Sequence, residues 1–99
     1  MRIMLACCAG MSTSLVVSKM QDEAAKQGKD YKIWAVEQGQ IEDELGNFDV
    51  LLLGPQVRYE LKNVKAKYPN KPVEVINMQD YGMMNGNKVL DTALKLIEG

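Results

Sequence analysis

Four short apolar runs, each followed by a segment with helical periodicity, constrain the fold of this chain more than any other feature. The runs span residues 2–6, 31–36, 49–53 and 73–76. Nearly continuous apolar runs of this length are typical of parallel strands that are covered on both faces. Because strands and helices alternate, the sequence predicts a parallel sheet with helices on both faces. Right-handed crossovers then favour the strand order 2-1-3-4.

The helices are predicted from apolar residues that recur at intervals of three and four. The first is expected to start at one of the hydroxyl residues 12–14, any of which can cap it, and to end before Gly28. The others are expected over residues 40–45, 57–68 and 87–98, and residues 77–86 are expected to be irregular. With 99 residues and no internal repeat or linker, the sequence predicts one domain, 1–99.

The turn between the first strand and the first helix concentrates the reactive groups of the chain. It reads Cys7-Cys8-Ala9-Gly10-Met11-Ser12-Thr13-Ser14. The start of a helix offers unpaired backbone N–H groups and the positive end of the helix dipole, which favour a bound anion. The same field favours a thiolate over a thiol. The sequence therefore predicts a nucleophilic cysteine beside an anion site, and Cys7 and Cys8 both qualify.

The predicted topology points to the same turn independently of its chemistry. In sheets of this order, ligands bind outside the carboxyl ends of the strands, where the chain reverses direction. The loops at that point span residues 7–14 and 54–56, which places Gln56 near the candidate cysteine. Tyr81 follows the fourth strand and is expected at the same end of the sheet. Both are therefore predicted to lie at the rim of the site.

Each residue of the turn also has a purely structural interpretation. A free cysteine is commonly a small buried apolar residue, and Gly10 suits an ordinary turn. The hydroxyl residues 12–14 are typical helix caps. Met83 and Met84 are expected to pack within a loop or the core rather than to form a contact surface. Because no exposed apolar face is evident in the sequence, a monomer is predicted.

Composition excludes several classes of function. Twelve basic and thirteen acidic residues give a net charge of −1, which lacks the basic excess that nucleic-acid binding requires. There is no histidine, so imidazole acid–base catalysis, a Cys–His dyad and histidine-containing zinc sites are excluded. Two adjacent cysteines do not form a disulfide framework, which indicates a reduced, cytoplasmic protein. The apolar start of the chain is too short to span a bilayer or to act as a signal peptide. No cofactor or metal is expected.

The spacing around the cysteines separates four kinds of chemistry. A cysteine phosphatase requires Cys-x5-Arg because the arginine clamps the phosphate, but Thr13 or Ser14 stands at that position. A thioredoxin-type site requires Cys-x-x-Cys, and a nucleotide-binding loop requires Gly-x-x-x-x-Gly-Lys-Ser/Thr. An aspartyl-phosphate site would place an aspartate after the third strand, where Leu53-Gly54 stands. What remains is a cysteine that accepts a phosphoryl group from another protein and passes it on.

The turn also resembles a known family. Its sequence from Cys7 to Leu15 is similar to the phosphocysteine loop of enzyme IIB of the lactose/cellobiose/chitobiose class, a component of the bacterial phosphoenolpyruvate-dependent sugar phosphotransferase system. Leu52-Leu53-Gly54-Pro55-Gln56, the stretch 69–76 and Tyr81-Gly82 also resemble that family, so the similarity covers nearly the whole chain. The resemblance implies a flavodoxin-like fold, similar to that of the small cysteine phosphatases.

The resemblance further implies which thiol reacts and with which partners. The family's phosphorylated cysteine stands two residues before Ala-Gly-Met-Ser-Thr-Ser, which is Cys7, with residues 8–14 as the phosphate-binding loop. Cys8 stands where the family commonly has a serine. The implied activity is that of a phosphotransferase: a IIA phosphohistidine protein phosphorylates Cys7, and the membrane permease IIC presents a β-disaccharide that receives the group. The chain would then be cytoplasmic and peripheral to the membrane through IIC. A cysteine phosphatase on a similar fold and a regulatory interaction module are the alternatives.

Overall fold

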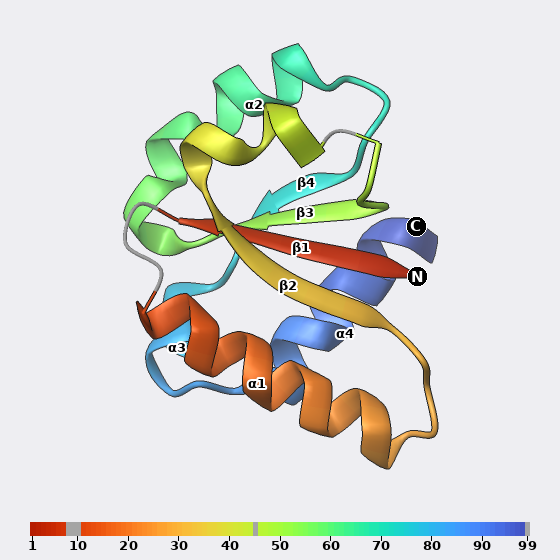
Figure 1. Cartoon of the computed structure of the whole chain (residues 1–99). Coiled ribbons are helices and arrows are strands. Elements are labelled where there is room, and N and C mark those ends of the chain that lie inside the picture. The colour runs from red at the N-terminus through yellow and green to blue at the C-terminus, as the bar shows by residue number, and fades with distance from the viewer. Residues whose placement is uncertain (8–10, 45, 99) are drawn as a thin grey trace.

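A four-stranded parallel sheet forms the centre of the protein. The computed structural model describes residues 1–7, 11–44 and 46–98. The strands are β1 (Arg2–Cys7), β2 (Lys32–Glu37), β3 (Val50–Leu53) and β4 (Val73–Val75). They lie in the order β2-β1-β3-β4, with every neighbouring pair parallel (Figure 1). The predicted fold class and strand order are confirmed.

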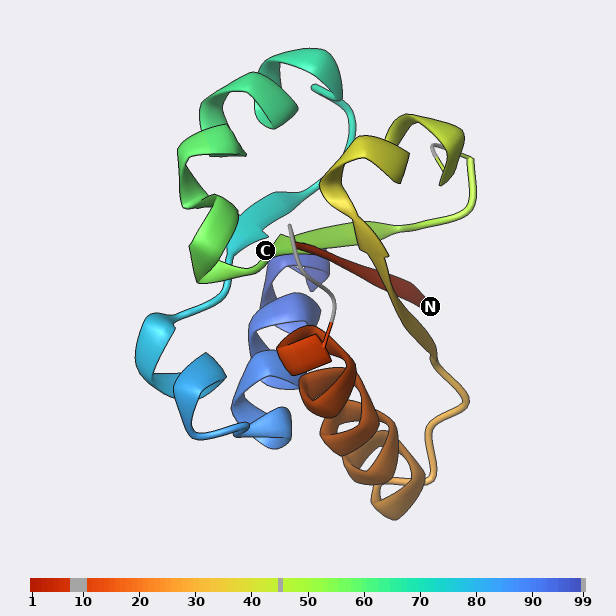
Figure 2. The same cartoon turned by 60° about the vertical axis from the view of Figure 1, so that its left-hand side comes forward.

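Helices cover both faces of the sheet. The helices α1 (Met11–Lys26), α3 (Met78–Gly82) and α4 (Gly86–Glu98) lie on one face (Figures 1 and 2). The opposite face carries α2 (Leu61–Lys67) and three 3-10 helices: η1 (Gln38–Gln40), η2 (Glu42–Glu44) and η3 (Pro55–Glu60). Each connection therefore crosses from one strand to the next by way of a helix, as parallel strands require.

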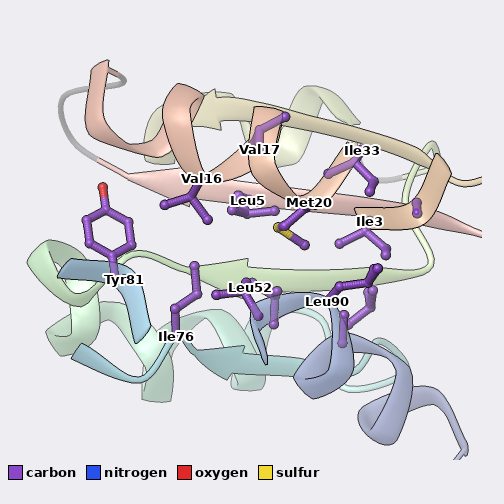
Figure 3. Packing of buried hydrophobic residues seen from close by; sticks show 14 residues of the cluster. Ile3, Leu5, Val16, Val17, Met20, Ile33, Leu52, Ile76, Tyr81 and Leu90 are labelled. Carbon is purple, nitrogen blue, oxygen red and sulfur yellow. The ribbon is translucent and has the colours of Figure 1, made fainter. Parts of the chain in front are cut away.

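Successive side chains of a strand point to opposite faces of the sheet, so the buried core forms two clusters, one on each face. Ile3 and Leu5 of β1 pack in the cluster beneath α1 and α4, whereas Met4 and Ala6 pack in the cluster beneath α2. Figure 3 shows the first cluster, in which Met20 of α1 packs against Leu5 and Ile3 of β1. Each fully buried aliphatic side chain of this size contributes about 1.5–3 kcal/mol relative to an exposed one. The two clusters therefore fix the sheet between the helix layers.

The ends of α1 show one confirmed expectation and one correction. Gly28 has φ +71°, and the N–H of Lys29 donates to the carbonyl of Ala24 at 2.9 Å, so Gly28 ends the helix in the left-handed conformation as predicted. The helix begins at Met11, one residue before the three hydroxyl residues that were expected to cap it. Those residues therefore lie inside its first turn.

Three predicted segments differ from the structure. The helix expected over residues 40–45 is replaced by the 3-10 helices η1 and η2, and Leu45 lies outside the described residues. The helix expected over 57–68 is divided, because Val57 has non-helical angles (φ −117°, ψ 24°) and regular α-helix begins at Leu61. Residues 77–86 were expected to be irregular but contain α3, whose N–H groups of Gln79 and Asp80 donate to the side chain of Asn77.

A pair of charges ties the start of β1 to the residue before β3. Arg2 Nη2 lies 3.0 Å from Asp49 Oδ1, and the Arg2 backbone N–H donates to Asp49 Oδ2 at 2.8 Å. The hydrogen bonds from the Arg2 side chain and backbone lower the pKa of Asp49. A carboxylate with a lowered pKa stabilises the folded state above its unfolded pKa of about 3.9, and this contribution is lost as the pH falls through the folded value.

Replacing Asp49 by asparagine is therefore expected to reduce the free energy of unfolding at neutral pH but not in acid. The reduction is small because both side chains are more than a third exposed. Urea unfolding measures the difference at about pH 7 and again in acid, where protonation of the Asp49 carboxylate removes the charge that asparagine lacks. An equal difference between the two proteins at both pH values would contradict this explanation.

Candidate functional site

Cys7 is the last residue of β1, at the carboxyl end of a central strand. It is paired in register with Glu37 of β2 and is 1% exposed. The neighbouring loop lies alongside because the N–H of Gly54 donates to the carbonyl of Ala6 at 2.8 Å. The two loops that the predicted topology placed at the switch point therefore meet at Cys7, as expected.

Gly54 leaves open the space beside the Cys7 side chain. A methyl group at Gly54 would lie 3.2 Å from Cys7 Cβ and 2.9 Å from Gln56 Oε1. Both side chains therefore converge on one point above Gly54. Gln56 is itself exposed, and its carboxamide oxygen lies beside Gly54, close to the candidate nucleophile. The sequence predicted the position of Gln56 but not the role of Gly54, which depends on the close approach of β1 and β3.

The first turn of α1 follows the cysteine and supplies the candidate anion site. Its first N–H groups have no partner within the helix, and the helix dipole adds positive potential there. Ser14 is exposed, whereas Thr13 has no exposed surface. The Thr13 hydroxyl lies 2.9 Å from the hydroxyl of Tyr81 in α3. The structure thus gives the hydroxyls of Ser14 and Thr13 different environments, exposed and buried, which the sequence alone did not distinguish.

The structure describes only part of the predicted loop. Cys8, Ala9 and Gly10 lie outside the described residues, as do the side chains of Met11 and Ser12. Their expected part in phosphate binding stays a prediction. The described members of the predicted site are Cys7, Thr13, Ser14, Gln56 and Tyr81, of which Cys7, Thr13 and Tyr81 are buried.

Large apolar side chains are exposed on segments that follow the carboxyl ends of three strands. Leu15 of α1, Tyr59 of η3, and Met78 and Met83 at the two ends of α3 are each more than half exposed. The expectation that Met83 packs in a loop or the core is wrong, because Met83 follows α3 as its C-cap residue and is 68% exposed. Met84 is 37% exposed and adopts φ +53°. The segments that carry these residues start at the same end of the sheet, the carboxyl end of the strands (Figure 1).

Two kinds of feature are absent from the described part of the chain. Within residues 1–7, 11–44 and 46–98, no group of three or more His, Cys, Asp or Glu side chains is placed to hold a metal ion. No helix in the same ranges is long and apolar enough to cross a membrane.

Comparison with known proteins agrees with this architecture. Residues 2–92 match the family described as PTS system, lactose/cellobiose-specific IIB subunit. The chain is 53% identical over 102 residues to the galactose-specific EIIB component of the PTS system of Lactococcus lactis subsp. cremoris (strain MG1363), covering 96% of this chain and 94% of the relative. It is also 53% identical, with the same coverage, to the cellobiose-specific EIIB component of Lactococcus lactis subsp. lactis (strain IL1403).

A solved structure extends the agreement to three dimensions. The cellobiose-specific phosphotransferase IIB component from Borrelia burgdorferi superposes with a TM-score of 0.84 at 37% sequence identity, over 99% of this chain and 92% of that one. The family match covers the sheet and nearly all of the helices, including both loops that meet at Cys7. This chain belongs to the lactose/cellobiose-specific IIB subunits of the sugar phosphotransferase system, which are phosphotransferase components.

Proposed function

We propose that Cys7 is the phosphoryl carrier of this chain. The observation that carries the proposal is its position: a thiol at the carboxyl end of a central strand, at the start of the connection to α1 and beside Gly54. The backbone N–H groups of residues 8–14 would surround the phosphoryl oxygens and disperse their charge. The chain has no histidine, so the acceptor must be another nucleophile, and a thiolate is the strongest available.

The transfer takes place in two in-line displacements. In the first, the Cys7 thiolate attacks the phosphorus of a phosphohistidine on a IIA protein; an S–P bond forms, the P–N bond breaks, and the imidazole nitrogen keeps the electron pair. In the second, a sugar hydroxyl attacks the same phosphorus; an O–P bond forms, the S–P bond breaks and the thiolate is restored. The hydroxyl proton passes to a base in the permease. Neither step consumes a cofactor.

The absence of an arginine after the cysteine suits a carrier rather than a hydrolase. At the Cys-x5-Arg spacing this chain has Thr13. An arginine clamp would stabilise transfer to water, whereas a carrier must hold the group until the correct acceptor arrives. Because Cys7 is 1% exposed, side chains at its rim must move aside for each transfer. Gln56, which is exposed and lies over Gly54, is the described side chain best placed to do so.

The partners follow from the family and from the surface around the site. We assign the donor to a IIA phosphohistidine protein and the acceptor to a β-disaccharide held by the membrane permease IIC, with this chain acting in the cytoplasm. The exposed residues Leu15, Tyr59, Met78 and Met83 border the end of the sheet where both partners would dock. Galactose-specific and cellobiose-specific relatives match this chain equally well, so sequence identity does not rank the sugars.

Mass spectrometry of the intact chain tests the proposal. After incubation with phosphoenolpyruvate, the general phosphotransfer proteins and the IIA protein, we expect one added phosphoryl group that disappears when permease-containing membranes and a β-disaccharide are supplied. Omission of IIA is the control. The proposal is wrong if the adduct forms equally without IIA, or if the chain alone hydrolyses an aryl phosphate over many turnovers, which would support the phosphatase alternative.

A further inference from the structure

The hydroxyls of Thr13 and Tyr81 form a buried contact between two helices that lie far apart in sequence. Their oxygens are 2.9 Å apart, and either can be the donor. Thr13 is 0% exposed and Tyr81 is 7% exposed. In Figure 3 the Tyr81 ring stands at the end of the apolar cluster, with its hydroxyl directed toward the start of α1. Each hydroxyl satisfies the other in a region that offers little water.

Tyr81 is itself held in place by the end of β4. The N–H of Ile76 donates to the carbonyl of Leu53, which extends the pairing of β3 and β4 by one bond. The next residue, Asn77, caps α3, and its carbonyl accepts from the N–H of Tyr81 at 2.9 Å. A short series of hydrogen bonds therefore connects the sheet to Tyr81. Through Thr13 the same series reaches the first turn of α1.

We infer that Thr13 and Tyr81 are a positioning pair for phosphoryl transfer at Cys7. The pair holds the first turn of α1, and with it the N–H groups that receive the phosphoryl oxygens, at a fixed distance from the end of β1. The Thr13 hydroxyl serves this contact and is not a phosphate ligand. Neither side-chain hydroxyl touches the reacting atoms. The inference rests on the proposed function of Cys7 and adds the pair of side chains that sets the geometry of the transfer.

The alternative explanation is that the contact only stabilises the fold. That role would lower the fraction of folded protein without changing the rate of the folded molecules. A positioning role instead predicts slower transfer at saturating IIA, because a displacement of about 1 Å in a reacting array can cost a factor of about one hundred. The concentration of IIA that gives half the maximal rate would stay unchanged, since the partner does not contact these buried hydroxyls.

The experiment measures single-turnover phosphorylation of Cys7 by phosphorylated IIA in a Cys8→Ser background, at a temperature where every variant is folded by circular dichroism. Thr13→Val and Tyr81→Phe each remove one hydroxyl with little change of shape, and each is expected to slow transfer about tenfold. The double variant is expected to be no slower than either single variant, because the two hydroxyls act as one unit. Thr13→Ser keeps a hydroxyl and is expected to stay within about twofold of the parent.

Tyr68→Phe is the matched control. Tyr68 is 6% exposed and belongs to the other core cluster, on the opposite face of the sheet, so the same chemical change there should leave the rate within about twofold. If Thr13→Val does not fold, Tyr81→Phe still decides the question. The inference is overturned if Tyr81→Phe transfers at the parent rate, or if it slows transfer no more than Tyr68→Phe does. If the parent itself accepts no phosphoryl group, the proposed function fails instead.

Discussion

Replacing Cys7 by serine is expected to abolish phosphorylation of this chain by phosphorylated IIA, a loss of at least about a thousandfold. Serine has nearly the same size as cysteine and suits the space beside Gly54, so the fold should persist. Its hydroxyl is a far weaker nucleophile at neutral pH than a thiolate, and the chain contains no histidine that could activate it as a general base. The rate of phosphoryl incorporation, followed by intact mass, measures the effect.

The matched control is Cys8→Ser, which removes the adjacent thiol. We expect this variant to accept one phosphoryl group at a rate close to that of the parent, because the family resemblance assigns the reaction to Cys7 alone. Phosphorylation that survives Cys7→Ser but is lost in Cys8→Ser would move the carrier role to Cys8. Loss in both variants would indicate that the two thiols act together, and would also contradict the assignment.

Replacing Gly86 by alanine is expected to produce the largest loss of stability among substitutions of the glycines that the structure describes. A methyl group there would lie 2.5 Å from the carbonyl carbon of Lys19 and 2.7 Å from its oxygen. These are backbone atoms of α1, so relief requires α1 and α4 to move apart and to loosen the apolar cluster between them. Overpacking of this kind costs about 1–3 kcal/mol, and contact with backbone places the cost near the upper end.

Thermal unfolding measures this effect, because 1 kcal/mol shifts the Tm of a chain of this size by about 4–8 °C. Gly82→Ala is the matched control: Gly82 is also helical, and a methyl group there meets no atom within 4 Å. That substitution should be neutral or should stabilise the protein by up to about 1 kcal/mol. Equal losses in the two variants would show that the close approach at Lys19 does not decide the outcome.

Local patterns were sufficient for the elements with long apolar periodicity. In the first helix, Val16, Met20 and Ala24 recur at intervals of four residues, which predicts one apolar face, and all three are buried. Helix α3 was missed because five residues are too few to show a period, although Asn77 is a favoured N-cap residue and therefore a recognisable start signal. No comparable sequence signal marks the division of the helix expected over 57–68 into η3 and α2. The division arises where the chain leaves β3 and packs Val57 into the core beneath α2.

The sequence by itself determined the strand order, the place of Cys7 at the switch point and the exclusion of an arginine clamp. Each of these follows from the order of residues along the chain, because period, spacing and handedness are local rules. Only the tertiary structure decided that the Thr13 hydroxyl contacts the hydroxyl of Tyr81, that Gly54 makes room beside Cys7, and that Gly86 meets Lys19. These contacts join residues from distant segments, and their distances depend on how the helices pack against the sheet, which no local pattern specifies.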